Sequence, residues 1–243
     1  MFLVSLNKHL RLINWFKEKK IQEPNLIEYL DLVSLGTVCD VVPLTGLNRA
    51  IVKQGLKVLK SKKNLGLKTL IDICGINTQP NVYHMGYVLG PRINAGGRVG
   101  KSSHGANLLL NNNAKEVFKI ASELDQFNKE RQYLEEDVLN KIAIEANKTQ
   151  SDPVIILSGK NWHEGVIGIV ASRLKDKFNK PVIIITVDKN LGKASARSII
   201  GFDIGSVIIA AMQEKILIKG GGHKMAGGFT IDVNNIERFK EFV

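Results

Sequence analysis

The chain has 243 residues, of which 44% are hydrophobic and 23% charged, and its formal net charge is +11. It is long enough for one large or two small domains with buried cores, and its apolar runs are too short to span a bilayer, so no membrane association is expected. Cys39 and Cys74 are too few for a disulfide framework or a zinc knuckle, which points to a reducing cytoplasm.

The positive charge is concentrated in one segment. Between Val41 and Lys115 there are eleven Lys or Arg residues and a single acid, Asp72. Such a segment favours a polyanionic partner, because neutralising phosphates releases counterions. A merely solvated lysine surface explains the composition equally well.

The first part of the chain has mostly helical periodicity. Residues 6–19 and 25–35 predict short amphipathic helices, and residues 48–59 a third, after a turn over 39–46. Four basic residues follow one face of that third helix, Arg49, Lys53, Lys57 and Lys60. They form either a phosphate track or a solvated face. Asp40 ends an apolar, strand-like or turn segment, where it could bind a metal or form an Asx turn.

A polar break at 111–113 precedes a long helical pattern over 114–147 that contains no glycine or proline. Its single apolar stripe is typical of a connector between two domains. Strands are then predicted over 154–157, 182–186, 194–199 and about 229–233, with helices over 164–178 and about 204–212. The pattern predicts an α/β fold with a mostly helical part at 1–112, a connector helix at 113–149 and a second domain at 150–243.

Three glycine-rich segments carry the candidate binding residues. In the first, residues 90–106, glycines would expose backbone N–H groups around Arg92 and Arg98, although the segment could be only a tight turn. In the second, a strand would place Ser195 and Arg197 on one face. The third, residues 219–231, is expected to be a loop around His223.

His163 lies where a helix should begin, and a local cap and a substrate contact both remain open for it. The sequence contains no DxD, HxH, HExxH or DHH motif. A two-metal phosphodiesterase site needs several carboxylate or imidazole ligands, and Asp40 alone cannot supply them. The chain therefore has no complete catalytic set.

Six segments in order resemble the RecJ family of single-stranded-DNA exonucleases, in the DHH phosphoesterase superfamily. They are SLGTVCDVVPLTGLNRAIVKQGL at 34–56, GYVLGPRINAGGRVG at 86–100, LDQFNKERQ at 124–132, WHEGVIGIVASRL at 162–174, ASARSIIGFDI at 194–204 and GGGHKMAGG at 220–228. The resemblance implies the helical remainder of a DHH domain followed by a DHH-associated, substrate-binding domain.

The resemblance also implies roles for individual residues. Asp40 would be the last acid of a site for Mn²⁺ or Mg²⁺, whose activated water attacks the phosphodiester. The residues implied in substrate binding are Arg92, Asn94, Arg98, His163, Ser195, Arg197, Gly221, Gly222 and His223. The expected partner is single-stranded DNA, gripped near its 5′ end, and no small-molecule cofactor is expected.

The chain departs from the family pattern at its start, because the family carries further aspartates and the DHH signature before the region that matches Met1. We therefore expect an internal fragment, most simply from a split or frameshifted gene, that is inert unless an upstream RecJ fragment completes it. Gly97 is a smaller departure, since the family more often has alanine there. Two alternatives stay open: a non-catalytic single-strand-binding module, and a DHH-family phosphodiesterase that acts on short oligonucleotides or cyclic dinucleotides.

Overall fold

The computed structural model describes residues 2–243, apart from the side chains of Phe2 and Gln150. The chain forms two compact units. Unit 1 is Met1–Asn94 with Ser103–Asp125, and unit 2 is Ala95–Ser102 with Gln126–Val243. Two helices contribute to both units, α6 (Gly90–Val99) and α8 (Ala114–Lys148). The domain boundaries expected at residues 112 and 150 stay a prediction.

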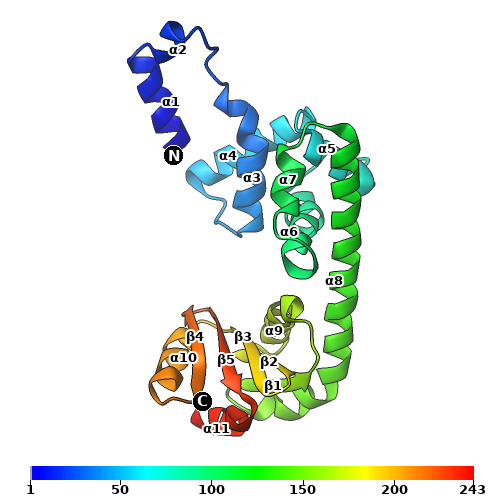
Figure 1. The fold of residues 1–243 in the computed structure, drawn as a ribbon, viewed down its shortest axis with the longest axis vertical. Coiled ribbons are helices and arrows are strands. Elements are labelled where there is room, and N and C mark those ends of the chain that lie inside the picture. The colour runs from blue at the N-terminus through cyan, green and yellow to red at the C-terminus, as the bar shows by residue number, and fades with distance from the viewer. Residues whose placement is uncertain (1) are drawn as a thin grey trace. The chain divides into compact units, whose positions relative to one another are not determined.

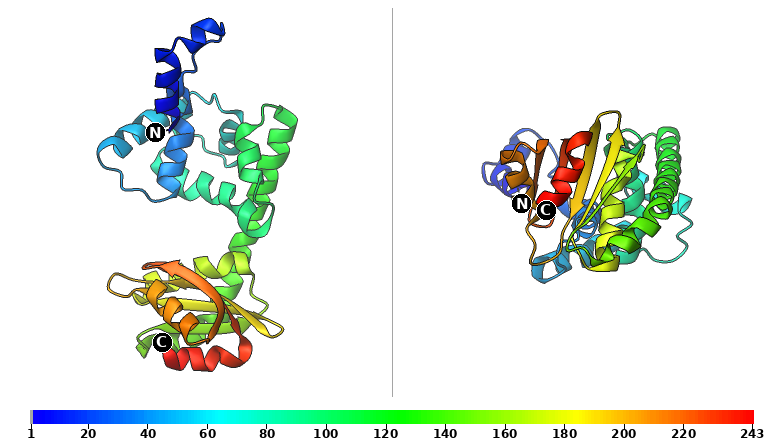
Figure 2. Two further views of the ribbon diagram at one scale, coloured as in Figure 1. Left: turned by 60° about the vertical axis from the view of Figure 1, so that its left-hand side comes forward. Right: turned by 90° about the horizontal axis from the view of Figure 1, so that it is seen from below.

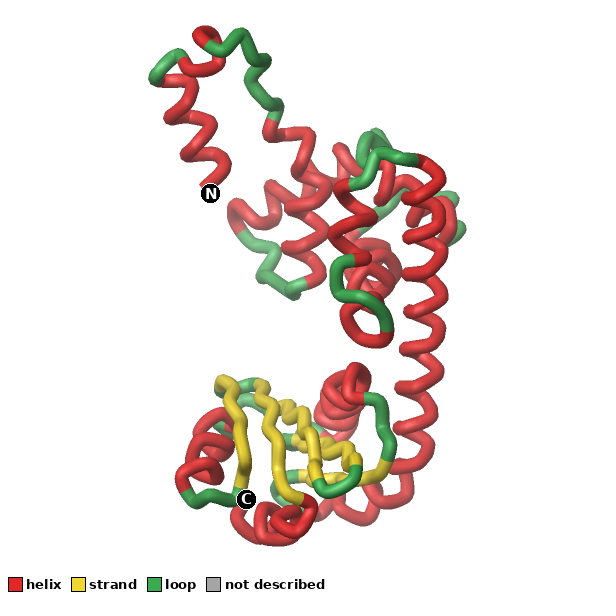
Figure 3. Tube along the Cα trace, in the orientation of Figure 1, coloured by secondary structure: helices red, strands yellow, loops and turns green. Residues whose placement is uncertain are grey.

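Unit 1 is built from helices alone within the described residues (Figures 1 and 3). They are α1 (Phe2–Leu12), α2 (Trp15–Glu18), α3 (Leu30–Cys39), α4 (Gly46–Lys60), α5 (Leu65–Ile73), α7 (His104–Leu110) and the first parts of α6 and α8. A 3-10 turn, Leu26–Tyr29, leads into α3, and a π-helical turn, His84–Leu89, leads into α6. Asn14 adopts a left-handed conformation with φ 56°, which is why the helix predicted over 6–19 is broken in two.

Helices α3 and α4 pack closely because of one glycine. A Cβ added at Gly55 would overlap Ser34 Oγ and the Leu30 carbonyl oxygen. Ser34 uses this proximity to donate a hydrogen bond of 3.1 Å to the Ile51 carbonyl of α4. A buried hydroxyl is thereby satisfied, and the two helices are fixed against each other.

Unit 2 contains a five-stranded sheet in the order β1-β2-β3-β5-β4. The strands are β1 (Ile155–Lys160), β2 (Val182–Asp188), β3 (Leu191–Arg197), β4 (Leu217–His223) and β5 (Ala226–Asp232). Only β1 and β2 run parallel, joined by the crossover helix α9 (Glu164–Phe178), and the other pairs are antiparallel. Helices α10 (Ile204–Gln213) and α11 (Ile236–Phe242) complete the unit, and Figure 2 shows the sheet from two further directions.

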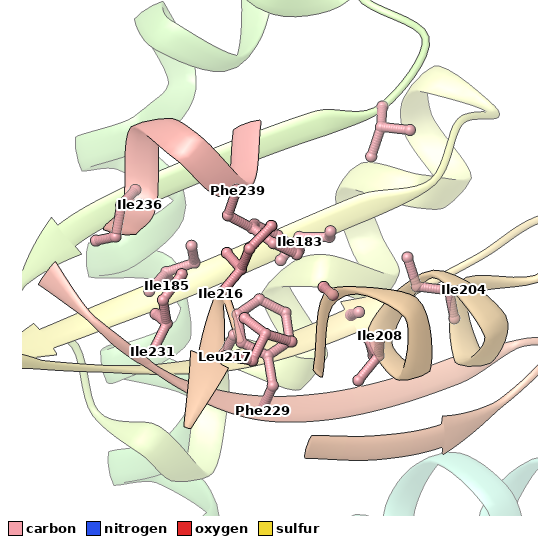
Figure 4. Close-up of a cluster of buried hydrophobic side chains, with 14 of the residues drawn as sticks. Ile183, Ile185, Ile204, Ile208, Ile216, Leu217, Phe229, Ile231, Ile236 and Phe239 are labelled. Carbon is pink, nitrogen blue, oxygen red and sulfur yellow. The ribbon is translucent and has the colours of Figure 1, made fainter. Parts of the chain in front are cut away.

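Each face of the sheet has its own core. On the face that we call the α9 face, Val182 and Ile184 of β2 pack with Val170 of α9 and Ile142 of α8. On the opposite face, which we call the α10 face, residues of four strands pack against α10 and α11. Figure 4 shows that second core, in which Ile183, Ile208, Ile216, Leu217, Phe229 and Phe239 converge.

The fold class is confirmed as α/β, and several predicted elements agree closely with the structure. The helix predicted over 164–178 is α9, and the helix predicted over 114–147 is α8. Asp40 lies in a turn, one of the two contexts expected for it, but the residues before it form helix α3 and not a strand. No helix within residues 2–243 is both long enough and apolar enough to cross a membrane.

Two predicted glycine loops are also wrong, and packing explains both. Residues 90–99 form helix α6, in which Gly90 leaves room for the Cys39 side chain. Residues 217–232 form the β4–β5 hairpin, where a Cβ at Gly220 or Gly227 would press against Ile208 of α10. These glycines serve close approach of helices and strands rather than loop geometry.

Candidate functional site

On the α9 face, strands β3, β5 and β4 form a partly exposed surface on which the residues are aligned in rows. Residues directly opposite each other on paired strands point to the same side of the sheet. The register therefore aligns three rows across β3, β5 and β4: Arg197–Ala226–His223, Ser195–Gly228–Gly221 and Lys193–Thr230–Lys219. The middle row contributes only one side chain, that of Ser195.

A hollow lies beside Ser195, where Gly228 of the middle row has no side chain. Its volume is about 480 Å³, and its floor includes Ser195, Gly228 and Thr230. Glu164 and Ile167 of α9 form one wall. A Cβ at Gly221, in the same row, would meet no atom within 4 Å, so packing does not require a glycine there.

Ser195 and Arg197 form a pair on β3, as predicted from strand alternation. Arg197 Nη1 donates to Ser195 Oγ at 3.2 Å and to the Ala196 carbonyl at 2.8 Å. Burial lowers the pKa of Arg197, and the positive charge of Arg98 lowers it further. The guanidinium stays charged nonetheless. A partly desolvated cation beside a second cation is a favourable place for an anion.

Helix α9 lies directly over this pair because residue 168 is glycine. A Cβ there would lie 2.9 Å from Ser195 Oγ and 3.1 Å from Arg197 Nη2. Gly165, one turn earlier, leaves room for the Arg98 backbone at the end of α6. Arg98 Nη1 donates to the Gly165 carbonyl at 3.2 Å. Arg98, Ser195 and Arg197 are therefore grouped within unit 2, and we call them the arginine clamp.

Arg92 and Asn94, which were predicted with Arg98, belong to unit 1 and are not part of this group. Arg92 Nε donates to Asp125 Oδ1 at 2.8 Å, and Arg92 Nη1 donates to the Val88 carbonyl at 2.8 Å. This largely buried ion pair ties α6 to α8. Asn94 is exposed.

The two predicted histidines both make local hydrogen bonds. His163 caps α9, because its Nδ1 accepts from the Gly165 N–H at 3.1 Å. It also lines a groove of about 1300 Å³ together with Arg98 and Lys193. His223 ends β4 next to Gly222, is exposed, and accepts at Nδ1 from the Met225 N–H at 3.3 Å. The substrate role of either histidine stays a prediction.

Asp40 is exposed, and residues 2–243 contain no group of three His, Cys, Asp or Glu side chains that could hold a metal. Its neighbour Cys39 is a poor candidate for a further ligand, because burial and the charge of Asp40 raise the pKa of the thiol and disfavour the thiolate. The described residues thus do not make a site for Mn²⁺ or Mg²⁺, and no hydrolytic step follows from them.

The basic stripe predicted on the third helix is present on α4. Arg49, Lys53, Lys57 and Lys60 are all exposed, while Val52 and Leu59 are buried. Two lysines beside the hollow, Lys193 and Lys219, were not among the predicted site residues. Strand alternation from Ser195 would have found Lys193. Lys219 could not be found because β4 was not predicted and has a register shift between Leu217 and Lys219.

Comparisons with known proteins show what the chain is similar to as a whole. Residues 151–243 match the family model of the DHHA1 domain. The chain is 38% identical to the single-stranded-DNA-specific exonuclease RecJ of Salmonella typhimurium over 98% of this chain and 43% of that protein. It is also 38% identical to RecJ of Bacillus subtilis, over 86% of this chain and 27% of that protein.

Solved structures of RecJ also resemble this chain. The crystal structure of RecJ from Thermus thermophilus in complex with Mn²⁺ superposes with a TM-score of 0.81 at 33% identity, covering 93% of this chain and 33% of that one. The complex of the same protein with Mg²⁺ gives a TM-score of 0.78 at 32% identity, with 93% and 35% coverage. The chain thus spans less than half the length of the curated RecJ proteins that it matches.

Proposed function

We propose that this chain, which is 38% identical to RecJ of Salmonella typhimurium over 98% of its own length, is the strand-gripping part of an exonuclease that hydrolyses single-stranded DNA from the 5′ end. One observation carries the proposal: the arginine clamp, in which a half-buried guanidinium lies beside a hydroxyl and a second arginine. The work it would serve is DNA repair and recombination in a reducing cytoplasm, in keeping with the free thiols Cys39 and Cys74.

The clamp suits a terminal phosphate because of its charge and geometry. A guanidinium binds two phosphate oxygens through parallel N–H donors, and the Ser195 hydroxyl can donate to a third. A terminal 5′-phosphate carries more negative charge than an internal phosphodiester, so it would gain more from two adjacent arginines. Gly228 and Gly221, in the row of Ser195, have no side chains that would stand in the way of a strand.

The proposal assigns no cutting step to the described residues. Hydrolysis in this family would use Mn²⁺ or Mg²⁺, and the described residues offer only Asp40 toward such a site. The remaining ligands would have to come from elsewhere, for example from an upstream RecJ fragment acting as a partner chain. No small-molecule cofactor and no membrane partner are part of the proposal.

Phosphate binding by the arginine clamp is tested with 5′-phosphorylated and 5′-hydroxyl oligonucleotides. Their binding to the whole chain is measured by fluorescence anisotropy. We expect tighter binding of the phosphorylated strand and loss of that preference in Arg197→Lys, which keeps the charge but not the bidentate fork. Arg238→Lys is the matched control, because Arg238 lies on α11 and donates to the Glu214 carbonyl. Equal affinity of the unaltered chain for both strands would contradict the clamp.

The nuclease itself is tested by mixing the chain with a polypeptide that carries the missing family motifs. Mn²⁺-dependent release of nucleotides from 5′-phosphorylated single strands is expected only from the mixture. Inactivity of the mixture, with binding retained, would leave the second candidate function, a non-catalytic single-strand-binding module. The lack of a metal-ligand cluster within residues 2–243 specifically favours that candidate. Binding confined to very short oligonucleotides would instead support the phosphodiesterase alternative.

A further inference from the structure

A cluster of buried charged and polar side chains lies on helix α8, within unit 2 and outside the arginine clamp. Asn128, Arg131 and Glu135 are spaced by three and four residues, so they share one face of the helix. Arg131 Nη1 donates to Glu135 Oε2 at 2.7 Å, and Arg131 Nη2 donates to Asn128 Oδ1 at 2.9 Å. The cluster begins within residues 124–132, a segment whose resemblance to the family implied no role for any side chain.

Glu135 also joins α8 to α9. Its other carboxylate oxygen, Oε1, forms an ion pair with Nε of Arg173, an exposed residue of α9. One buried carboxylate thus neutralises arginines from two helices, and we call Arg131, Glu135 and Arg173 the Glu135 triad. The apolar core that Ile142 and Val170 share holds α8 and α9 together without fixing a direction. Charged hydrogen bonds are directional, so the triad can determine how far α9 is shifted along α8.

The position of α9 matters because this helix contacts the arginine clamp with no room to spare. A Cβ at Gly168 would lie 2.9 Å from Ser195 Oγ. The carbonyl of Gly165, one turn earlier on α9, accepts a hydrogen bond of 3.2 Å from Arg98 Nη1. A displacement of α9 by a few tenths of an ångström would therefore change its contacts with both Ser195 and Arg98.

Helix α8 also contacts the segment that carries Arg98. A Cβ added at Gly100, two residues after Arg98, would lie 2.5 Å from a ring carbon of Phe127. The chain at the end of α6 thus lies directly against the start of the α8 segment that ends at Glu135. The same stretch of α8 therefore holds both the Arg98 segment and helix α9, and it links two parts of the clamp.

The triad is a poor way to join two helices if stability alone is required. Burying charges removes their hydration, and replacing a buried arginine–glutamate–arginine set by apolar side chains of similar size is often neutral or stabilising. Apolar side chains do not supply a directional contact, however, and buried polar groups fix the register of helices in some proteins. The burial of Glu135, which is 1% exposed, therefore points to a role in positioning.

We propose that the Glu135 triad positions the arginine clamp. By fixing α9 against α8, it determines how closely Gly165 and Gly168 approach the clamp, and thereby the preference for a 5′-phosphate over a 5′-hydroxyl. The three side chains of the triad act through α9 and not on the phosphate itself. This inference rests on the proposed function and names what keeps the clamp in its binding geometry.

The first test removes the link to α9 at its exposed end. In Arg173→Gln the charge on α9 is lost while Glu135 keeps Arg131, so unit 2 should remain folded. The affinities of the whole chain for 5′-phosphorylated and 5′-hydroxyl oligothymidylates are measured by fluorescence anisotropy. Their ratio should fall about twofold to fivefold, because α9 is displaced while every donor of the clamp is still present. Arg173→Lys keeps the ion pair and should retain the ratio.

The matched control is Lys175→Gln, which removes one positive charge from the same helix. Lys175 pairs with Asp176 within α9, so its loss does not affect the link to α8. Loss of a surface charge weakens the binding of both oligonucleotides alike, and the ratio should stay unchanged in this control. An unchanged ratio in Arg173→Gln, or an equal fall in Lys175→Gln, would overturn the positioning role.

The second test separates positioning from stability. A triple variant, Arg131→Met with Glu135→Leu and Arg173→Met, replaces the triad by apolar side chains of similar size. The urea midpoint of unit 2, followed by Trp162 fluorescence in a Trp15→Phe background, should be unchanged or higher, while the ratio falls at least as far as in Arg173→Gln. A folded triple variant with the full ratio would overturn the proposal, and if this variant does not fold, Arg173→Gln and its control decide.

The outcomes also distinguish this inference from the proposed function. If the unaltered chain shows no preference for a 5′-phosphate, the proposed function fails, whatever the triad variants do. If the unaltered chain shows the preference and Arg173→Gln keeps it in full, the clamp stands and the positioning role of the Glu135 triad is overturned.

Discussion

The two units differ most in how they cover their apolar side chains. Of the large hydrophobic side chains that are exposed within the described residues, seventeen lie in unit 1 and eight in unit 2. Unit 2 buries both faces of its sheet in separate cores, whereas unit 1 leaves Leu12, Val41 and Leu47 at least 66% exposed.

This contrast indicates which unit can stand alone. Burial of apolar area is the main stabilising term, so a unit with uncovered apolar helices is expected to be less stable and more prone to association. The candidate binding surface lies on the well-covered unit, where its geometry does not depend on the uncovered helices. Four substitution experiments, taken in order of decreasing expected effect, test whether unit 2 is stable and binds independently of unit 1.

Truncation of the unit 2 core should have the largest effect. Phe239 is fully buried, with its ring centroid 4.8 Å from that of Phe229. Phe239→Ala should lower the free energy of unfolding of unit 2 by about 3–5 kcal/mol. Trp162 reports on unit 2 by fluorescence during urea unfolding, in a Trp15→Phe background, because Trp15 is the other tryptophan and lies in unit 1.

The companion variant is Leu70→Ala, which removes a fully buried side chain of unit 1. It should leave the Trp162 transition unchanged if the units unfold separately. A shift of that transition comparable to the one caused by Phe239→Ala would mean a single cooperative unit, and the contrast between the units would be broken.

The two arginines of α6 should separate structural from binding roles. Arg92→Gln removes the ion pair with Asp125 at a largely buried position, so unit 1 should lose about 1–3 kcal/mol of stability. Arg98→Gln should change stability by less than about 0.5 kcal/mol, because the Arg98 side chain is exposed. Urea unfolding and the 5′-phosphate binding assay are run on both variants. A loss of 5′-phosphate preference in Arg92→Gln but not in Arg98→Gln would reverse the assignment.

Gly168 offers a finer test of the clamp. In Gly168→Ala the new methyl group would displace the Ser195 hydroxyl and the Arg197 guanidinium, and we expect 5′-phosphate affinity to fall about threefold to tenfold, equivalent to about 0.7–1.4 kcal/mol. Gly97→Ala is the control, since no atom lies within 4 Å of the added Cβ and alanine favours the helix. Unchanged binding in Gly168→Ala would contradict this prediction, because it would show that phosphate binding does not depend on the close approach of helix α9 to Ser195 and Arg197.

The sequence predicted regular elements well where local periodicity decides them. The spacing of apolar residues determines α8 and α9, and alternation on β3 placed Ser195 and Arg197 on one face. The glycines were misread because their partners are distant in sequence, as with Gly90 and Cys39 or Gly220 and Ile208. Local rules cannot distinguish a glycine that admits a neighbour from one that opens a loop.

The candidate site was predictable only in part, for the same reason. Arg92 belongs to a glycine- and arginine-rich segment, yet its partner Asp125 is 33 residues away, and only the fold shows that the two pair. Lys219 aligns with Lys193 through strand pairing and a register shift that no periodicity signals. The sequence indicated phosphate binding through its arginines, lysines and serines. Which of these side chains lie together depends on contacts between residues that are distant in the sequence.

The smallest expected effect concerns an acid in unit 1. Asp31, on the first turn of α3, is 3% exposed, and its Oδ1 accepts from the Leu32 N–H at 2.8 Å. Burial raises the pKa of this carboxyl above its ordinary value. The folded state therefore binds more protons than the unfolded state in the pH window between an unfolded pKa of about 3.9 and the higher folded pKa.

In that window the free energy of unfolding falls as pH rises, because the folded state must give up a proton that the unfolded state has already lost. Asp31→Asn cannot titrate and keeps an oxygen acceptor for Leu32, so it should remove this fall and make unit 1 more stable than the unaltered chain at neutral pH. Urea unfolding at several pH values measures it. Asp72→Asn, which breaks an exposed pair with Lys62, is the control and should change stability little. If Asp31→Asn instead destabilised unit 1 at neutral pH, the buried carboxylate would stabilise the unit. The expectation that unit 1 is the less stable of the two units would then lose this support.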